Sequence, residues 1–289
     1  MDEEELDYGP EEEELVLVKD QRIKVIDTHF HWDKFFLQAR FSGLPSYTWE
    51  EKGNEKFQIR YLISNFVFPS RWKACLNSEL LSKVRSIKHT IGIHPKIAGN
   101  QVGQLLKELK KRIPGKFMAI GEYGLDVSQG DKDLREQIKV LRVQLELAKS
   151  NYLPVVTHCR GGENIASRYL DIMTESLDRG HGVHWHCFSE DKKKYENIKR
   201  CLPNTKFGIS PLLLMDDKYP QLRSQVCEMQ LEDIILESDS PYIHPKNYED
   251  NSPLLIKAII QKLAIMFNTS GREIAEITTR NAHQLYKFE

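Results

Sequence analysis

The sequence predicts a single TIM-type (β/α)8 barrel. Short apolar runs alternate about eight times with longer amphipathic stretches. Most of the short runs are almost continuously hydrophobic, as expected of parallel strands that are covered on both faces. Histidines and carboxylates follow the ends of these runs, and in a barrel all of those ends open on one face. An open, doubly wound sheet is the alternative that the same alternation allows.

The predicted strands are short and rich in apolar side chains, and turn-forming or polar residues bound them. The first contains Ile23-Lys24-Val25-Ile26, and the fifth contains Pro154-Val155-Val156. Their ranges are 23–28, 57–65, 87–93, 117–122, 154–158, 182–187, 205–210 and 233–238.

Helical patterns lie between the strands. The clearest runs from Asp133 to Ser150, where apolar side chains recur every three or four residues and form one stripe. The last predicted helix begins at Ser252-Pro253, a pair typical of an N-cap and a first turn. The other predicted helices are 71–84, 101–112, 161–178, 190–201 and 216–230, and the last spans 252–267.

The domain organisation predicted from the 289 residues is one barrel over 21–289, preceded by an acidic leader over 1–20. Residues 1–14 hold nine carboxylates and no Lys or Arg, so we expect the leader to be disordered. The rest of the chain carries 41 basic and 33 acidic residues, a net charge of +8. A basic body is compatible with a polyanionic substrate such as nucleic acid.

The composition is that of a soluble protein, with 40% apolar and 29% charged residues. No run approaches the roughly 18 apolar residues of a membrane span, and the acidic start does not resemble a signal peptide. The five cysteines form no C-x-x-C pair. We therefore expect reduced thiols, no membrane association and an intracellular location, in the cytoplasm, the nucleus or both.

The first strand ends in Asp27-Thr28-His29-Phe30-His31. Side chains two residues apart on a strand share a face, so a carboxylate and two imidazoles point the same way. Such donors together suit a metal ion. The other predicted strand ends carry His94, Glu122, His158, His184 with His186, and Asp239. Spacing alone does not choose between His184 and His186, which share one face.

Six motifs, in chain order over about residues 23–289, resemble the TatD family of metal-dependent deoxyribonucleases, and most closely its animal members. That family belongs to the amidohydrolase-like barrel superfamily. The motifs are Asp27-x-His29-x-His31, Gly92-Ile93-His94-Pro95, Gly121-Glu122-x-Gly124-Leu125-Asp126, His158-Cys159-Arg160, His186-Cys187-Phe188 and Glu237-Ser238-Asp239-Ser240-Pro241-Tyr242.

The resemblance implies two divalent metal ions, Mg²⁺, Mn²⁺ or Zn²⁺. One ion would be held by His29, His31, Glu122 and Asp239. The other would be held by Glu122, His158 and His186, with Glu122 bridging the two. Asp27 and Asp126 would orient ligands rather than bind an ion.

The activity that the resemblance implies is hydrolysis of phosphodiester bonds in DNA from the 3′ end by metal-activated water, with RNA as a second candidate substrate. Asp239 would orient that water and accept its proton, and Glu122 is the second catalytic carboxylate. His94 and Arg160 would contact the scissile phosphate. Trp32, Phe188 and Tyr242 lie beside the motifs and are candidates for stacking on bases.

Two other functions compete with this prediction. A barrel amidohydrolase acting on a small amide or lactone often bridges its metals with a carboxylated lysine, where this chain has Glu122. A catalytically inactive barrel would bind nucleic acid or a partner without turnover. The complete set of candidate ligands argues against the inactive barrel.

Overall fold

A computed structural model describes most of the chain. The described residues are 22–37, 47–51, 53–76, 86–98, 102–113, 117–131, 133–248 and 252–288. The acidic leader predicted over residues 1–20 lies outside these ranges, so its disorder stays a prediction.

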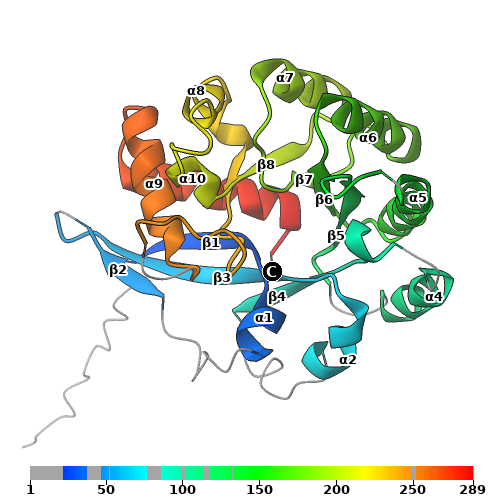
Figure 1. Ribbon diagram of the computed structural model, residues 1–289. Coiled ribbons are helices and arrows are strands. Elements are labelled where there is room, and N and C mark those ends of the chain that lie inside the picture. The colour runs from blue at the N-terminus through cyan, green and yellow to red at the C-terminus, as the bar shows by residue number, and fades with distance from the viewer. Residues whose placement is uncertain are drawn as a thin grey trace, which may run out of the picture.

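Parallel strands are hydrogen-bonded to one another in chain order and form a nearly closed barrel (Figure 1). The ring closes between the first and last strands, where the His31 amide donates to the Ser240 carbonyl at 2.8 Å and the Asp239 amide donates to the His29 carbonyl at 2.9 Å. The barrel prediction is confirmed and the open-sheet alternative is wrong. The strands of the ring are β1 (Ile23–Phe30), β3 (Lys56–Phe66), β4 (Ile87–Ile91), β5 (Ala119–Asp126), β6 (Val155–Arg160), β7 (Val183–Trp185), β8 (Thr205–Ile209) and β9 (Ile234–Leu236).

Helices surround the strands on the outside (Figure 1). Their apolar stripes pack on outward-facing strand residues in one continuous core. The helices are α1 (Trp32–Leu37), α2 (Pro69–Leu76), α4 (Val102–Arg112), α5 (Leu134–Ser150), α6 (Glu163–Ser176), α7 (Lys192–Cys201), α8 (Leu222–Cys227), α9 (Leu255–Met266) and α10 (Gly271–Tyr286). Short 3₁₀ turns add η1 (Pro95–Ile97), η2 (Pro211–Leu214) and η3 (Leu231–Asp233).

Three elements differ from the prediction. The strand β2 (Thr48–Glu50) pairs antiparallel with β3 and was not predicted. The helix predicted over 216–230 is reduced to α8, because Pro220 stands at the fifth position of the predicted range and the chain turns before it. The helix predicted over 71–84 is observed as α2, and its second half lies outside the described residues.

The last helix, α10, was also missed, although its start carries a clear signal. Ser270 caps the helix by accepting a hydrogen bond from the Glu273 amide at 3.1 Å, in the Ser-x-x-Glu pattern of a capping box. The last buried apolar residues of α10 join residues of the barrel strands in a second core, whereas Ile274 and Ala275 pack in the first. The second core contains Ile26, Ile63, Ala119, Val156, Ile235, Ala282, Leu285 and Tyr286.

This helix seals the end of the barrel where the strands begin. Asn281 donates to the Ile234 carbonyl at 2.7 Å, and Thr279 donates to the Lys24 carbonyl at 3.0 Å. The polar residues that end the strands are therefore at the opposite, open end of the barrel.

Candidate metal centre

Seven polar side chains converge from six barrel strands, β1, β4, β5, β6, β7 and β9, and from the loops that follow them. None is more than 7% exposed, although each is a histidine or a carboxylate. Buried groups of this kind require partners or a cation. The seven residues are His29, His31, His94, Glu122, His158, His186 and Asp239.

The first group of donors lies around the end of β1. The Nε2 atoms of His29 and His31 are 3.2 Å apart. Oε2 of Glu122 lies 3.4 Å from Nε2 of His29 and 3.9 Å from Nε2 of His31. Oδ1 of Asp239 lies 3.8 Å and 3.3 Å from the same two nitrogens.

These separations match what one ion requires. Ligand atoms about 2.1 Å from a tetrahedrally coordinated ion lie about 3.4 Å from one another. The five distances above range from 3.2 to 3.9 Å. Five of the six separations among two imidazole nitrogens and two carboxylate oxygens are therefore close to those of ligands to one ion, and the donor types fit a divalent cation.

The second group of donors lies around the other oxygen of Glu122. Nδ1 of His158 contacts Oε1 of Glu122. Nε2 of His94 and Nε2 of His186 lie 3.7 Å and 3.8 Å from the same oxygen. Asp239 also contacts both groups, because its Oδ2 lies 3.8 Å from Nε2 of His186 while its Oδ1 lies near His29 and His31. Both carboxylates thus present one oxygen to each group.

The electrostatics of the centre follow from this crowding. Burial raises the pKa of Glu122, but His158 and His186 outweigh that effect and hold the pKa well below its usual value. Burial and the neighbouring His186 lower the pKa of His29 to about 4, so this imidazole keeps a free lone pair at neutral pH. A charged carboxylate beside a neutral imidazole is the protonation state that a metal site needs.

Asp126 fixes the ring of His158 from the side away from Glu122. Oδ2 of Asp126 lies 3.0 Å from Nε2 of His158, and Oδ1 accepts bonds from the amide and hydroxyl of Ser128. With Nε2 bound to Asp126, Nδ1 is the nitrogen that faces Glu122. A carboxylate in this position sets the tautomer of a ligating histidine.

Asp27 does not enter either group of donors. It is fully buried, and its Oδ2 accepts a bond from the Ser238 hydroxyl at 2.6 Å while its Oδ1 accepts one from the Ser238 amide at 3.0 Å. Burial raises its pKa to about 7. Asp27 therefore ties β1 to the segment that carries Asp239.

The structure distinguishes the two histidines that spacing left equivalent. Nε2 of His186 faces Glu122 and Asp239, whereas His184 lies deeper, with its Nε2 2.9 Å from Oε2 of Glu237. Glu237 also contacts Nδ1 of His186 at 3.1 Å and accepts a bond from the Cys187 amide. Glu237 was missed as a site residue, although it shares the strand face of Asp239.

Arg160 and the three aromatic candidates have different surroundings. Burial lowers the pKa of Arg160, but Cys187, Asp239 and Glu122 outweigh that effect and hold the pKa above its usual value. Trp32 and Phe188 are buried in the core, so the expectation that they stack on bases is wrong. Tyr242 is 47% exposed and remains accessible.

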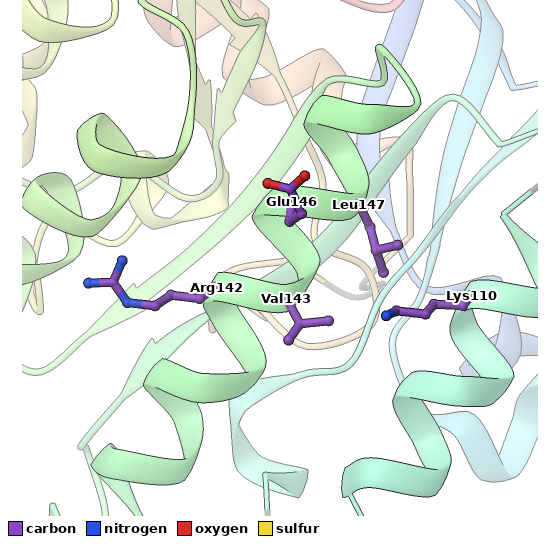
Figure 2. A pocket seen from close by; sticks show the side chains of 5 residues that line it. All are labelled: Lys110, Arg142, Val143, Glu146 and Leu147. Atoms are coloured by element: carbon purple, nitrogen blue, oxygen red, sulfur yellow. The ribbon is translucent and has the colours of Figure 1, made fainter.

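A separate groove lies on the outer surface, between α4 and α5. Figure 2 shows Lys110 of α4 facing Val143 and Leu147 of α5 across it. Arg142 and Glu146 complete the lining. The groove belongs to the helical layer, and no member of the metal centre lines it.

No helix in the described part of the chain is both long enough and apolar enough to cross a membrane.

Comparison with known proteins supports the resemblance. A family model described as TatD related DNase matches residues 26–287. The human 3′-5′ RNA nuclease TATDN2 is 31% identical over 76% of this chain, which spans 29% of the length of that protein. The 3′-5′ ssDNA/RNA exonuclease TatD of Erwinia tasmaniensis is 27% identical over 69% of this chain and 78% of its own length.

A solved structure has the same fold. The TatD homologue YJJV of Escherichia coli K12 superposes with a TM-score of 0.74 at 23% identity, covering 92% of this chain and 98% of its own. Because the family model spans nearly the whole barrel, the chain belongs to the TatD-related DNase family.

Proposed function

We propose that this protein is a metal-dependent nuclease that hydrolyses phosphodiester bonds of single-stranded DNA or RNA from the 3′ end. The observation that carries the proposal is that Glu122 and Asp239 each direct one oxygen to each of two groups of histidines. Two cations bridged in this way are the arrangement that phosphodiester hydrolysis commonly uses. The names of the relatives supply the substrate class and the polarity.

The donors divide between two proposed ions according to the two groups. His29, His31, Glu122 and Asp239 would hold the first ion, and Glu122, His158 and His186 would hold the second. His94 lies as close to Glu122 as His186 does, so it is available to the second ion or to the substrate. When bound, divalent ions lower the pKa of water and stabilise negative charge on phosphate oxygens.

The other roles follow from position. Asp239 lies where it would orient the attacking water and accept its proton, because its carboxylate reaches both groups of donors. Arg160 would bind the non-bridging phosphate oxygens with its planar guanidinium. Asp126 would hold His158 in the orientation that keeps Nδ1 toward the centre.

The experiment that tests this proposal uses the full chain with single-stranded DNA and RNA labelled at the 5′ end. With Mn²⁺ or Mg²⁺ we expect a ladder of products that shortens from the 3′ end. EDTA should abolish it, and Asp239→Asn should lower the rate by at least about 100-fold.

A matched control is Asp216→Asn, because Asp216 is an exposed surface partner of Lys262. This variant should cleave at the wild-type rate. If the wild type cleaves neither substrate with either metal, the nuclease proposal fails. Turnover of an amide or lactone instead would support the amidohydrolase alternative.

A further inference from the structure

The rim of the metal centre carries one exposed aromatic ring, Tyr242, that the catalytic roles above do not use. Its ring packs on His31 in a T-shaped arrangement with centroids 4.7 Å apart, and its side chain is 47% exposed. Because His31 Nε2 lies 3.3 Å from Asp239, the ring stands next to the first group of donors. An exposed aromatic ring at this distance from the chemistry is available to a substrate.

The backbone holds this ring in a fixed place. The Tyr242 amide donates to the Asp239 carbonyl at 2.8 Å, which closes a turn between the two residues. The Asp239 amide is itself bonded to the His29 carbonyl of β1. Tyr242 is therefore attached to the same turn that positions Asp239.

Two cationic side chains lie over aromatic rings in this region, Lys34 over Tyr242 and Arg71 over Phe68. Nζ of Lys34 lies 5.3 Å from the centre of the Tyr242 ring. Arg71 is bonded to the buried Asp33 at 2.6 Å, and its guanidinium lies 5.3 Å from the ring of Phe68. Phe68 in turn stacks on His94 with centroids 5.8 Å apart. Lys34 and Arg71 thus each lie near an aromatic ring that contacts a histidine of the centre, Tyr242 on His31 and Phe68 on His94.

This combination matches one class of ligand. Proteins bind single-stranded nucleic acid by stacking bases on aromatic rings while cations contact the phosphates. Stacking accepts any base, as a nuclease without sequence preference requires. Because Tyr242 contacts His31 directly, a base stacked on its ring would be within one nucleotide of the phosphate bound at the metal centre.

We propose that Tyr242 is a stacking subsite for the base next to the scissile phosphodiester, and that Lys34 contacts the adjoining phosphate. This proposal rests on the proposed nuclease function for the position of the cut, but not for binding itself.

The test is a thermodynamic cycle between protein and strand. Wild type and Tyr242→Leu are each measured on a single-stranded DNA oligomer and on oligomers with one base removed, at successive positions from the 3′ end. At one position near the end, Tyr242→Leu should raise KM by about 5- to 100-fold when the base is present and leave it unchanged when the base is absent. Tyr242→Phe should retain the wild-type values.

The matched control is Tyr152→Leu, because Tyr152 is 92% exposed and precedes β6 at the sealed end of the barrel. It should behave as wild type on every strand. The same cycle is measured as a Kd by fluorescence anisotropy in EDTA with Asp239→Asn, conditions under which we expect no cleavage. Absence of cleavage by the wild type would overturn the nuclease function. The Kd values would still show whether Tyr242 stacks on a base.

Two results would overturn the subsite. One is that Tyr242→Leu weakens the binding of every strand equally, whether or not a base has been removed. That result is expected if the ring has only a structural role. The other is that the substitution weakens none of them.

Discussion

The imidazole of His184 and the hydroxyl of Tyr286 meet inside the barrel, with Nδ1 and the oxygen 2.6 Å apart. Both residues are buried, and 102 positions separate them in the chain. Burial lowers the pKa of His184, so the ring is neutral and Nδ1 accepts the bond from the hydroxyl. Through this hydrogen bond, Tyr286 of the sealing helix α10 contacts a histidine inside the barrel.

This bond continues to the metal centre. Nε2 of His184 donates to Glu237, whose pKa is held low by His186 and His184 despite burial. The same oxygen of Glu237 accepts from Nδ1 of His186, which leaves Nε2 of His186 to face Glu122. Tyr286 thus positions a proposed ligand through two intermediate side chains.

Tyr286→Phe removes the hydroxyl and leaves Nδ1 of His184 buried without its partner. We expect the free energy of unfolding to fall by about 1–3 kcal/mol. We also expect Mn²⁺ affinity to weaken several-fold, within the limit of about 10- to 100-fold for direct partners of a ligand. Urea unfolding in EDTA gives the first quantity, and titration calorimetry with Mn²⁺ gives the second.

Tyr195→Phe provides the matched control. The Tyr195 hydroxyl is also buried and bonded, to Asp233 at 2.7 Å, but it lies in the outer helical layer. This variant should lose comparable stability and keep the wild-type affinity for Mn²⁺. Equal affinities in both variants would show that the Tyr286 hydroxyl serves stability alone.

A second prediction concerns Gly208 on β8. A Cβ atom built there would lie 2.1 Å from Oε2 of Glu237 and 2.7 Å from Nε2 of His184. Gly208→Ala should therefore displace both side chains, lower the unfolding free energy by about 1–3 kcal/mol and weaken Mn²⁺ binding. Gly103→Ala is the control, because nothing lies within 4 Å of its added Cβ. A wild-type Mn²⁺ affinity in Gly208→Ala would contradict this account.

Much of this arrangement was predictable from the sequence. Continuous apolar runs specify parallel strands, and strand order then follows from the preference for neighbouring connections. His29, His31, Glu122, His158 and Asp239 were identified as candidates because residues that end parallel strands share one face. The structure brings all five together.

The features that the sequence did not predict depend on how deep each side chain lies along the barrel axis. His184 and His186 point to the same face of the chain. The two-residue step between them places His184 inside the barrel and His186 at its open end. Glu237 was overlooked because its partners His184 and His186 lie 53 and 51 positions away in the chain. Strand parity gives the face that a side chain occupies, whereas its height depends on register and on the partner elements.

Metal stoichiometry gives a third prediction. Metal-free wild type should bind two equivalents of Mn²⁺, and His158→Ala should bind one, because His158 belongs only to the second group of donors. Asp126→Asn should keep two equivalents but weaken the second by about 10- to 100-fold, since it disturbs the orientation of His158. Titration calorimetry and elemental analysis after desalting measure these values. A single equivalent in the wild type would refute the two-ion arrangement.

A fourth prediction concerns pH and His89, a histidine outside the metal centre. His89 of β4 packs against Phe66, with ring centroids 5.5 Å apart, and its Nδ1 is buried with no partner among the described residues. Burial, with a smaller contribution from Lys88, lowers its pKa to about 4. In the unfolded chain the pKa returns to about 6.5.

Between these two pKa values the unfolded state binds more protons than the folded state at His89. Its contribution to stability is therefore complete above about pH 6.5 and is lost as the pH falls toward 4, with a slope of up to about 1.4 kcal/mol per pH unit. His89→Gln removes this titration, so its unfolding free energy should fall less steeply with acid. Urea unfolding in EDTA at several pH values between about 7 and 4.5 measures the two slopes. Parallel slopes would mean that His89 is protonated in the folded state, and that the packing of Phe66 does not exclude its charge.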